Sequence, residues 1–464
     1  MTESRPRRLE KFLNLFTDVR AGESTTALLL GLNVFLILMA YYVLKPVREA
    51  LILGEGSAEL KSYLSAGQVV LLALVVPFYG RLVAKYARMK LINVVTVFFA
   101  VCPVIFYVLA QFGVPLAVVF FVWIGIFSLM IIAQFWAFAN DVYTKEEGER
   151  LFVIVGFGAS LGAVGGARIA DRLIEPLGVY QLMLLGAAIL FGQLWLTNYI
   201  NGRENRRRPS AATKVSAPAG AKAKPSGSNA FAMVFRTRYL LLMALMLMLV
   251  NWVNTTGEYI LGSIVKDTAV SMVAQGQSSG LTEEQLIGDF YSKYFSIVNV
   301  LGLVLQLFVV SRVVKHLGMT WAVMILPVIS LLTYNILIFL PTLWFVLAGK
   351  VAENSTDYSL NNTVRNMLFL PCTYEQKFSA KQAIDSFFVR MGDVLSALLV
   401  FAGTSVWVLQ PRGFAAINAL LVVIWLGLAW RVGRYYKQLA ETGQPPTSEV
   451  VTAGTRPAAS PSGA

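Results

Sequence analysis

The chain has 464 residues, of which 56% are apolar and 14% are charged, and its mean hydropathy is +0.64. This composition excludes a soluble globular protein of this length and is typical of a protein with many membrane-spanning helices. The net charge of +13 would suit a nucleic acid, but most of the 39 lysines and arginines lie on one side of the expected membrane. We therefore interpret the charge as the positive-inside bias and expect a lipid bilayer, not a nucleic acid, as the large partner.

The first element expected is a short amphipathic helix within residues 1–25, with Leu9, Phe12, Leu13 and Phe16 on one side and basic residues around them. Such a helix suits the inner surface of a membrane. We expect no cleavable signal peptide, because the first apolar segment is too long for one and lacks a small-residue cleavage site.

Apolar segments of about 18 residues or more then predict twelve membrane-spanning helices. They cover residues 26–53, 62–84, 91–111, 114–138, 151–171, 178–198, 239–262, 290–311, 319–340, 343–370, 382–409 and 413–433. An even number of spans returns the chain to its starting side, so both termini are expected in the cytoplasm. The predicted fold class is an all-α integral membrane protein of the bacterial inner membrane.

A polar stretch divides these spans into two groups of six. Residues 201–237 are basic and rich in Ala, Pro, Ser and Gly, which predicts a flexible cytoplasmic linker. The expected units are therefore a half at 26–200, a half at 238–436 and a disordered cytoplasmic tail at 437–464.

Each half carries a short basic loop after its second span, Gly80–Arg88 and Ser311–Gly318. The first resembles the loop motif G-x-L-x-D-R-x-G-R of the major facilitator superfamily, with Ala84 at the acidic position and Ala87 at a glycine position. This resemblance and the duplication imply two six-helix repeats around a central cavity, with the substrate near the midplane.

The first span ends in a charged face. Tyr41, Lys45 and Arg48 fall within about 60° of one another on a helical wheel, and Pro46 should kink the helix between the two cations. A charge at the centre of a membrane helix costs about 2.5 to 3.5 kcal/mol, so it tends to face a wet cavity or a partner. The face is a candidate anion site; in the alternative, both cations only extend to the membrane surface.

The fifth span is rich in glycine, a pattern found both in phosphate-binding loops and in closely packed membrane helices. The residues are Gly156, Gly158, Gly162, Gly165 and Gly166. Because no Lys-Ser or Lys-Thr follows them, a phosphate-binding loop is disfavoured. Small residues at this spacing favour close packing of membrane helices.

Charged and amide side chains also lie within spans seven, ten and eleven. They are Asn254 and Glu258, then Lys350, Glu353, Asp357 and Asn361, then Lys381, Asp385, Arg390 and Asp393. The four residues of span ten fall within about 80° of one another and form one polar stripe. The stripe is either the wall of a cavity or a structural ion pair of Lys350 with Glu353, and Arg390 is expected to pair with Asp393.

The sequence favours no catalytic site. The two cysteines, Cys102 and Cys372, provide neither a disulfide framework nor a metal cluster. We found no activated nucleophile, no metal-ligand spacing and no cofactor loop, so we expect no enzyme, no metal and no cofactor.

Three groups of residues resemble the ATP/ADP translocases of plastids and intracellular bacteria. The first is Tyr41-x-x-Lys45-x-x-Arg48-Glu49-x-Leu51. The second is Phe135-Trp136-x-Phe138-Ala139-Asn140 followed by Thr144-x-x-Glu147-x-x-Arg150-x-Phe152 and Gly156. The third is Leu370-Pro371 followed by Ala380-Lys381-Gln382-Ala383-Ile384-Asp385.

Three departures from the family pattern stand out. The family's Lys-Asp pair is Arg48-Glu49 in this chain, which preserves the signs but changes the hydrogen-bond geometry. The acidic residue that the family has in span seven falls on or near Asn254 in this chain. A lysine of the family motif is replaced by Glu149.

The resemblance implies a secondary transporter that exchanges ATP and ADP, or carries related anionic metabolites, by alternating access. We expect it to be a monomer. The residues expected to bind substrate are Lys45, Arg48, Glu49, Asn254, Glu258, Lys350, Glu353, Asp357 and Lys381. Those expected to act as gate or coupling residues are Asn140, Asp141, Glu147, Arg150, Asp385, Arg390 and Asp393. The cavity acids would also suit a proton-coupled symporter or efflux pump, and a non-transporting scaffold or receptor is a third alternative.

Overall fold

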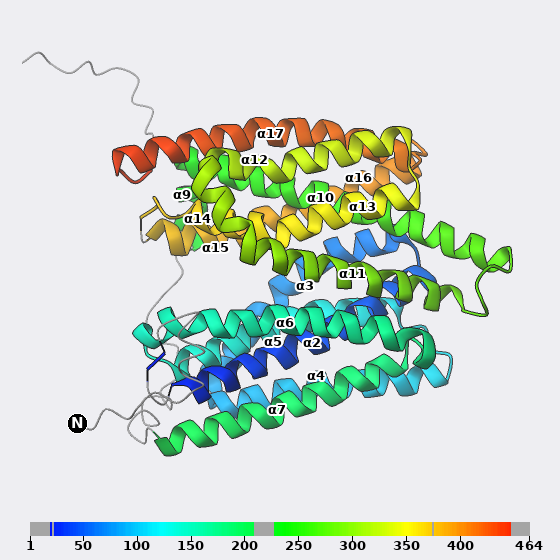
Figure 1. Ribbon diagram of the computed structural model, residues 1–464, viewed down its shortest axis with the longest axis horizontal. Helices are drawn as coiled ribbons and strands as arrows, with labels where there is room; N and C mark the ends of the chain where they lie inside the picture. The colour runs from blue at the N-terminus through cyan, green and yellow to red at the C-terminus, as the bar shows by residue number, and fades with distance from the viewer. Residues whose placement is uncertain (1–18, 21–22, 208–226, 374, 447–464) are drawn as a thin grey trace, which may run out of the picture.

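The computed structural model describes residues 19–20, 23–207, 227–373 and 375–446. The described chain is built from helices gathered into two bundles (Figure 1). The bundle of the N-terminal half contains α2 (Ser24–Gly54), α3 (Ala58–Lys85), α4 (Arg88–Gln111), α5 (Ala117–Val142), α6 (Lys145–Leu177) and α7 (Gln181–Arg207).

The second bundle belongs to the C-terminal half and contains several short π-helical turns, labelled η. Its elements are α9 (Gly227–Arg236), α10 (Arg238–Ala274), α11 (Glu283–Phe308), α12 (Val310–Phe339), α13 (Leu343–Thr356), η1 (Asp357–Asn361), α14 (Asn362–Met367), η2 (Gln376–Ala380), α15 (Lys381–Ala383), η3 (Ile384–Phe388), α16 (Val389–Ser405) and α17 (Pro411–Thr442).

Side-chain caps determine where several helices begin. Ser57 accepts a hydrogen bond from the amide of Leu60 at the start of α3. Thr144 and Glu147 form a capping box at the start of α6, which satisfies two amides that the first helical turn leaves free. The loop expected at Gly80–Arg88 is mostly helical, because α3 continues to Lys85 before α4 begins.

Eleven helices of the described chain are long and apolar enough to cross a membrane. The expected span 343–370 is not among them, although α13, η1 and α14 follow one another without a gap there. Every 18-residue stretch of that run contains Lys350, Glu353 and Asp357. The run is therefore too charged to be identified by its composition, and the count of twelve spans stays a prediction.

The ends of the expected linker and tail are more ordered than predicted. Helix α7 continues to Arg207, and α9 forms inside the linker, where the side chain of Val234 is fully buried. Helix α17 continues into the expected tail, as far as Thr442. The expected amphipathic helix lies almost entirely outside the described residues, as do 208–226 and 447–464.

Glycines bring α2 and α6 into backbone contact. A Cβ atom added at Gly158, Gly162 or Gly166 would collide with backbone atoms of α2, including the carbonyl oxygens of Gly31 and Phe35. The packing role predicted for this glycine pattern is confirmed for these three glycines, whereas a Cβ atom at Gly156 would meet nothing within 4 Å.

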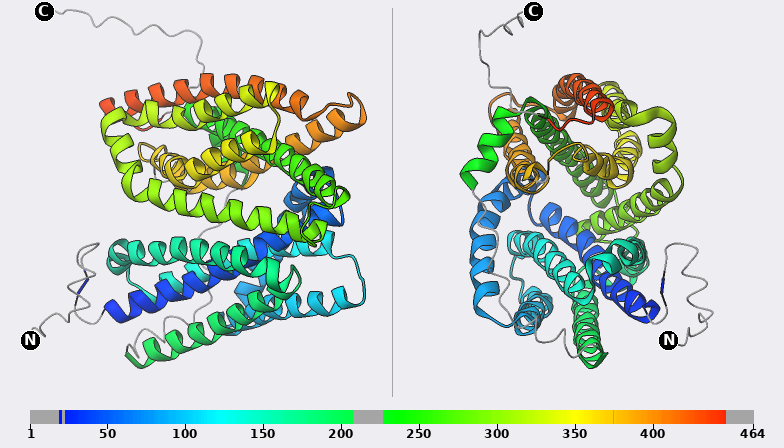
Figure 2. Two further views of the ribbon diagram at one scale, coloured as in Figure 1. Left: turned by 45° about the vertical axis from the view of Figure 1, so that its right-hand side comes forward. Right: turned by 90° about the vertical axis from the view of Figure 1, so that its left-hand side faces the viewer.

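The two bundles are joined mainly at one end. Helix α2 begins, and α7 and α17 end, at what we call the terminal end (Figures 1 and 2). Contacts between the halves gather toward the other end, which we call the opposite end. They include Tyr259 with Glu59 at 2.9 Å, Lys293 with Glu175 at 3.6 Å and the ring pair Tyr63 and Phe401. The structure is thus closed at the opposite end.

Candidate functional site: a charged cavity between the halves

A cavity of about 240 Å³ lies between the two halves. Seventeen residues from both halves line it: Tyr41, Lys45, Arg48, Lys61, Ser62, Ser65, Gln68, Phe121, Asn251, Asn254, Thr255, Glu258, Tyr259, Phe295, Asn354, Tyr358 and Asp393. The wall therefore combines three cations, two carboxylates, several amides and hydroxyls, and five aromatic rings. Such a wall suits a ligand with anionic and planar parts.

Lys45 is the cation of this wall that lacks a carboxylate partner. Its side chain is buried, with 7% of the residue exposed, and Nζ lies 3.5 Å from the hydroxyl of Tyr358 and 4.0 Å from the ring centre of Phe295. Within the described residues, no carboxylate is recorded within 4 Å of this Nζ atom. Aromatic faces hold the ammonium group in place, and it keeps the capacity to bind an anion.

The two other cations of the cavity wall, Arg48 and Lys61, share Glu49 as a partner. This glutamate is 1% exposed and does not line the cavity. The guanidinium Nε of Arg48 donates to its Oε1 at 3.0 Å, and Nζ of Lys61 lies 2.7 Å from its Oε2. Glu49 therefore positions two cations at the cavity wall instead of contacting a ligand, because a buried charge needs a partner.

A matching cluster lies in the second half. Nζ of Lys350 lies 2.9 Å from Oδ1 of Asn254, 3.1 Å from Oε2 of Glu353 and 3.5 Å from Oε1 of Glu258. The predicted ion pair of Lys350 with Glu353 is thus present. Glu258 and Asn254 continue this cluster to the cavity surface, whereas Lys350 itself is buried behind them.

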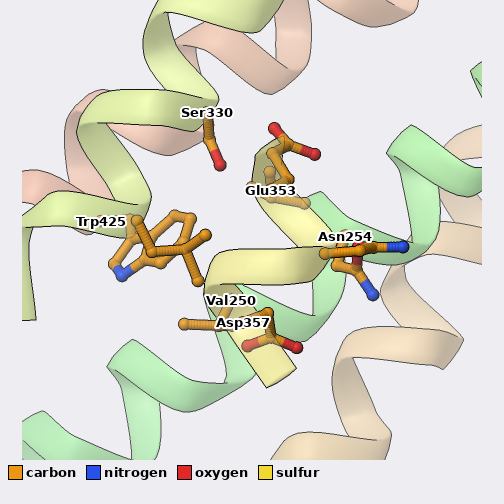
Figure 3. A pocket seen from close by; sticks show the side chains of 9 residues that line it. Val250, Asn254, Ser330, Glu353, Asp357 and Trp425 are labelled. Carbon is orange, nitrogen blue, oxygen red and sulfur yellow. The ribbon is translucent and has the colours of Figure 1, made fainter. Parts of the chain in front are cut away.

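Glu353 and Asp357 face a separate small pocket inside the second half (Figure 3). Its volume is about 10 Å³, roughly the space of one water molecule. Asp357 accepts a hydrogen bond from Asn361 at 2.6 Å. None of the four residues of the polar stripe predicted for span ten lines the central cavity. Two of their neighbours on the same run, Asn354 and Tyr358, do line it.

Asp393 is the second carboxylate of the cavity wall. It accepts a hydrogen bond from the hydroxyl of Thr255 at 2.8 Å and lies 3.4 Å from Nη1 of Arg390. The predicted pair of Arg390 with Asp393 is present, and it places a compensated carboxylate next to Asn251 and Thr255.

The remaining predicted residues lie away from the cavity, at the terminal end. Lys381 contacts the side-chain oxygen of Asn366 at 2.8 Å and does not line the cavity, because three short helical segments, η2, α15 and η3, place it well before α16. Its expected position in the central site is therefore not found. Asp385 pairs with Arg365 of the same half.

The gate residues predicted after span four also form contacts inside one half. Asp141 pairs with Arg88, and Arg150 binds both carboxylate oxygens of Glu23 at 2.9 and 3.1 Å. Asn140 is exposed, and Glu147 closes the capping box of α6. These contacts brace the N-terminal bundle at its terminal end, and the pairs named here do not connect the two halves.

Lys61 is the principal residue that the sequence reading missed. The second span was expected to begin at residue 62, which left Lys61 in a loop, whereas α3 begins at Ala58. Ser57 followed by Glu59 in the first turn is a helix-start signal that would have placed Lys61 inside the helix. Among the aromatic residues, Tyr358 of span ten also lines the cavity.

Comparison with known proteins relates the chain to transporters. Residues 30–365 match the family model described as Major Facilitator Superfamily. The ADP,ATP carrier protein 1 of Chlamydia pneumoniae is 23% identical over 94% of this chain and 96% of that protein. The protein of the same name from Chlamydia muridarum is 24% identical over 71% of this chain and 67% of its own length.

Solved transporter structures share the fold. The nucleoside transporter NupG superimposes with a TM-score of 0.59 at 14% identity, over 90% of this chain and 99% of that chain. A bacterial homologue of the iron transporter ferroportin, in an inward-facing state, superimposes with a TM-score of 0.60 at 14% identity, over 88% of this chain and 98% of that chain.

Proposed function

The chain belongs to the Major Facilitator Superfamily, and we propose that it is a secondary transporter that exchanges ATP and ADP across a bacterial inner membrane by alternating access. The similarity to the chlamydial ADP,ATP carriers, over nearly the whole chain, supports the nucleotide as substrate. The two-bundle fold with a cavity between the bundles supports the mechanism.

The observation that carries the proposal is the ammonium group of Lys45, which has no carboxylate partner among the described residues. Burying a charge without a counter-ion is expensive, so a protein that keeps one at a cavity wall gains when an anion binds there. Arg48 and Lys61 stand beside it in the same wall. Three cations in one cavity suit a chain of phosphate groups.

The rings of the cavity suit the base of a nucleotide. Tyr41, Phe121, Tyr358 and Phe295 line the same wall as Lys45. Flat apolar faces stack on a purine, while hydroxyl groups and amides such as Asn254 can bind its edge. The substrate's phosphates would then lie toward Lys45, Arg48 and Lys61.

The charge distribution supports an orientation with the terminal end in the cytoplasm. Cations gather at this end: Lys85, Arg88, Lys90, Arg203, Arg206, Arg207, Arg236, Arg238, Arg312, Lys315, Arg365, Lys377, Arg434 and Lys437. The positive-inside rule assigns such an end to the cytoplasm. The structure, closed at the opposite end, would then represent a carrier open to the cytoplasm.

Substitution of Lys45 tests this proposal. We expect Lys45→Gln to weaken binding of ATP to the purified protein about 10- to 100-fold, because a hydrogen bond to a charged group contributes about 1.5 to 3 kcal/mol. Titration calorimetry in detergent measures this directly. Lys315→Gln, which removes an exposed cation of α12, is the control and should bind ATP normally. Equal binding by both variants would refute the role of Lys45.

A further inference from the structure

Lys61 lies where the two halves meet, and it has carboxylate partners in both. Its Nζ atom is 2.7 Å from Oε2 of Glu49 on α2 and 3.7 Å from Oε2 of Glu258 on α10. The side chain of Lys61 is 9% exposed and that of Glu258 is 21% exposed. The pair of Lys61 with Glu258 is thus an ion pair between the halves that borders the cavity.

Glu258 is the weaker of the two partners of Lys61 and the more easily replaced. It is farther from Nζ, it faces the cavity, and it has other partners, since Asn354 donates to it at 3.0 Å and Lys350 lies 3.5 Å away. Glu49 is fully enclosed. An anion that enters the cavity can therefore take the place of Glu258 beside Lys61 and leave both glutamates partnered.

Loss of this ion pair would loosen the closed end. Helices α3 and α10 also meet through Tyr259, which directly follows Glu258, and Glu59, which lies two residues before Lys61. Loss of one partner from a buried ion pair costs more than the same loss from an exposed pair, such as Lys293 with Glu175, because the remaining charge stays buried, whereas water screens an exposed charge. The pair of Lys61 with Glu258 can therefore couple the occupancy of the cavity to the contacts at the opposite end.

We propose that Lys61 binds the substrate anion in exchange for Glu258, and that this change of partner releases the opposite end so that only the loaded carrier reorients. The inference rests on the proposed transport function and adds a residue and a coupling step to it. In the empty cavity the ion pair holds the halves together at the opposite end. Exchange is then obligatory, because an empty carrier keeps that end closed.

Coupled transport in proteoliposomes tests this step. The quantity measured is the uptake of labelled ATP into vesicles that contain ADP, divided by the uptake into empty vesicles. We expect this ratio to be high for the unmodified protein and to fall toward one in Lys61→Gln and Glu258→Gln, which both lack the ion pair. Lys61→Gln should also weaken the apparent affinity about tenfold, whereas Glu258→Gln, which keeps Lys61, should not.

Lys293→Gln is the matched control, because it removes another lysine from an ion pair between the halves but outside the cavity. It should leave the ratio unchanged. A purely structural role of Lys61 would lower both uptakes together and leave the ratio high, and that result would overturn the proposal.

Cross-linking separates failure of this step from failure of nucleotide transport. Cysteines at positions 175 and 293, with Cys102 and Cys372 replaced by serine, report closure of the opposite end. ATP or inorganic pyrophosphate should lower cross-linking, and the Lys61→Gln background should abolish this response. A response to pyrophosphate that depends on Lys61, without any ATP uptake, would uphold the change of partner and reject the nucleotide. A ligand response that persists in Lys61→Gln would reject the change of partner.

Discussion

The cations of the cavity have the same charge but different surroundings, and this decides their roles. Lys45 is held by rings and lacks a recorded carboxylate neighbour in the described chain. Arg48 is bound by Glu49 beside it in the sequence, and Lys61 lies between Glu49 and Glu258. Lys45 can therefore bind an anion directly, whereas the other cations already have a protein carboxylate beside them.

The buried thiol of Cys372 allows a prediction about a single residue. Burial raises the pKa of this thiol to about 11, so at pH 7 it has about 300-fold less thiolate than a free cysteine with a pKa of about 8.5. The thiolate is the reactive form, so labelling by maleimide should be slow at pH 7 and accelerate as the pH rises toward 11. Mass spectrometry of the labelled folded protein checks this, with the denatured protein as the control. Equally fast labelling of both at pH 7 would contradict it.

Single residues were predictable from the sequence where a charge interrupted an apolar run. This signal found Lys45, Arg48 and Glu258, which line the cavity. The amide Asn254 and the acid Asp393, which was predicted as a gate or coupling residue, line it too. The signal could not show which charges neutralise one another, because the partners come from different helices. Lys61 was missed because the predicted span began one residue after it. Lys381 was assigned to the cavity because a family motif does not show how far its residues lie from the site.

Among the elements, the contact of α2 with α6 depends most directly on residue size. We expect Gly162→Leu to lower the stability of the folded protein by about 1 to 3 kcal/mol, because the added side chain would meet the backbone of Phe35 and overpacked sites cost about that much. Gly156→Leu is the control, since a Cβ there meets nothing within 4 Å. Thermal unfolding in detergent compares them, and equal melting temperatures would contradict the packing argument.

The tenth span shows what hydrophobicity can and cannot predict for an element. Its position was predicted correctly as a helical run, but its charges exclude it from a search based on composition. The π-helical turn at Asp357–Asn361 contains Tyr358, which reaches the central cavity, while Asp357 faces the small pocket behind it. Such turns are rare and occur often at functional sites, and the sequence gives no periodic signal for them.

At the scale of the whole molecule, the sequence predicted two bundles and a cavity between them, and the fold confirms both. The motifs that resemble ATP/ADP translocases agree with a similarity that extends over 94% of the chain. Which end of the cavity is closed was not predictable, because it depends on contacts between residues far apart in the sequence, such as Tyr259 with Glu59. Alternating access requires each state to be closed at one end and open at the other. Contacts between the halves that gather at one end meet this requirement.

The most direct test of nucleotide exchange is the uptake of labelled ATP by purified protein in proteoliposomes that contain ADP, inorganic phosphate or buffer alone. We expect rapid uptake with internal ADP and little uptake with buffer alone, because the empty carrier stays closed at its opposite end. Correctly folded protein that takes up no ATP under any of the three conditions would contradict the assignment of nucleotides as substrate.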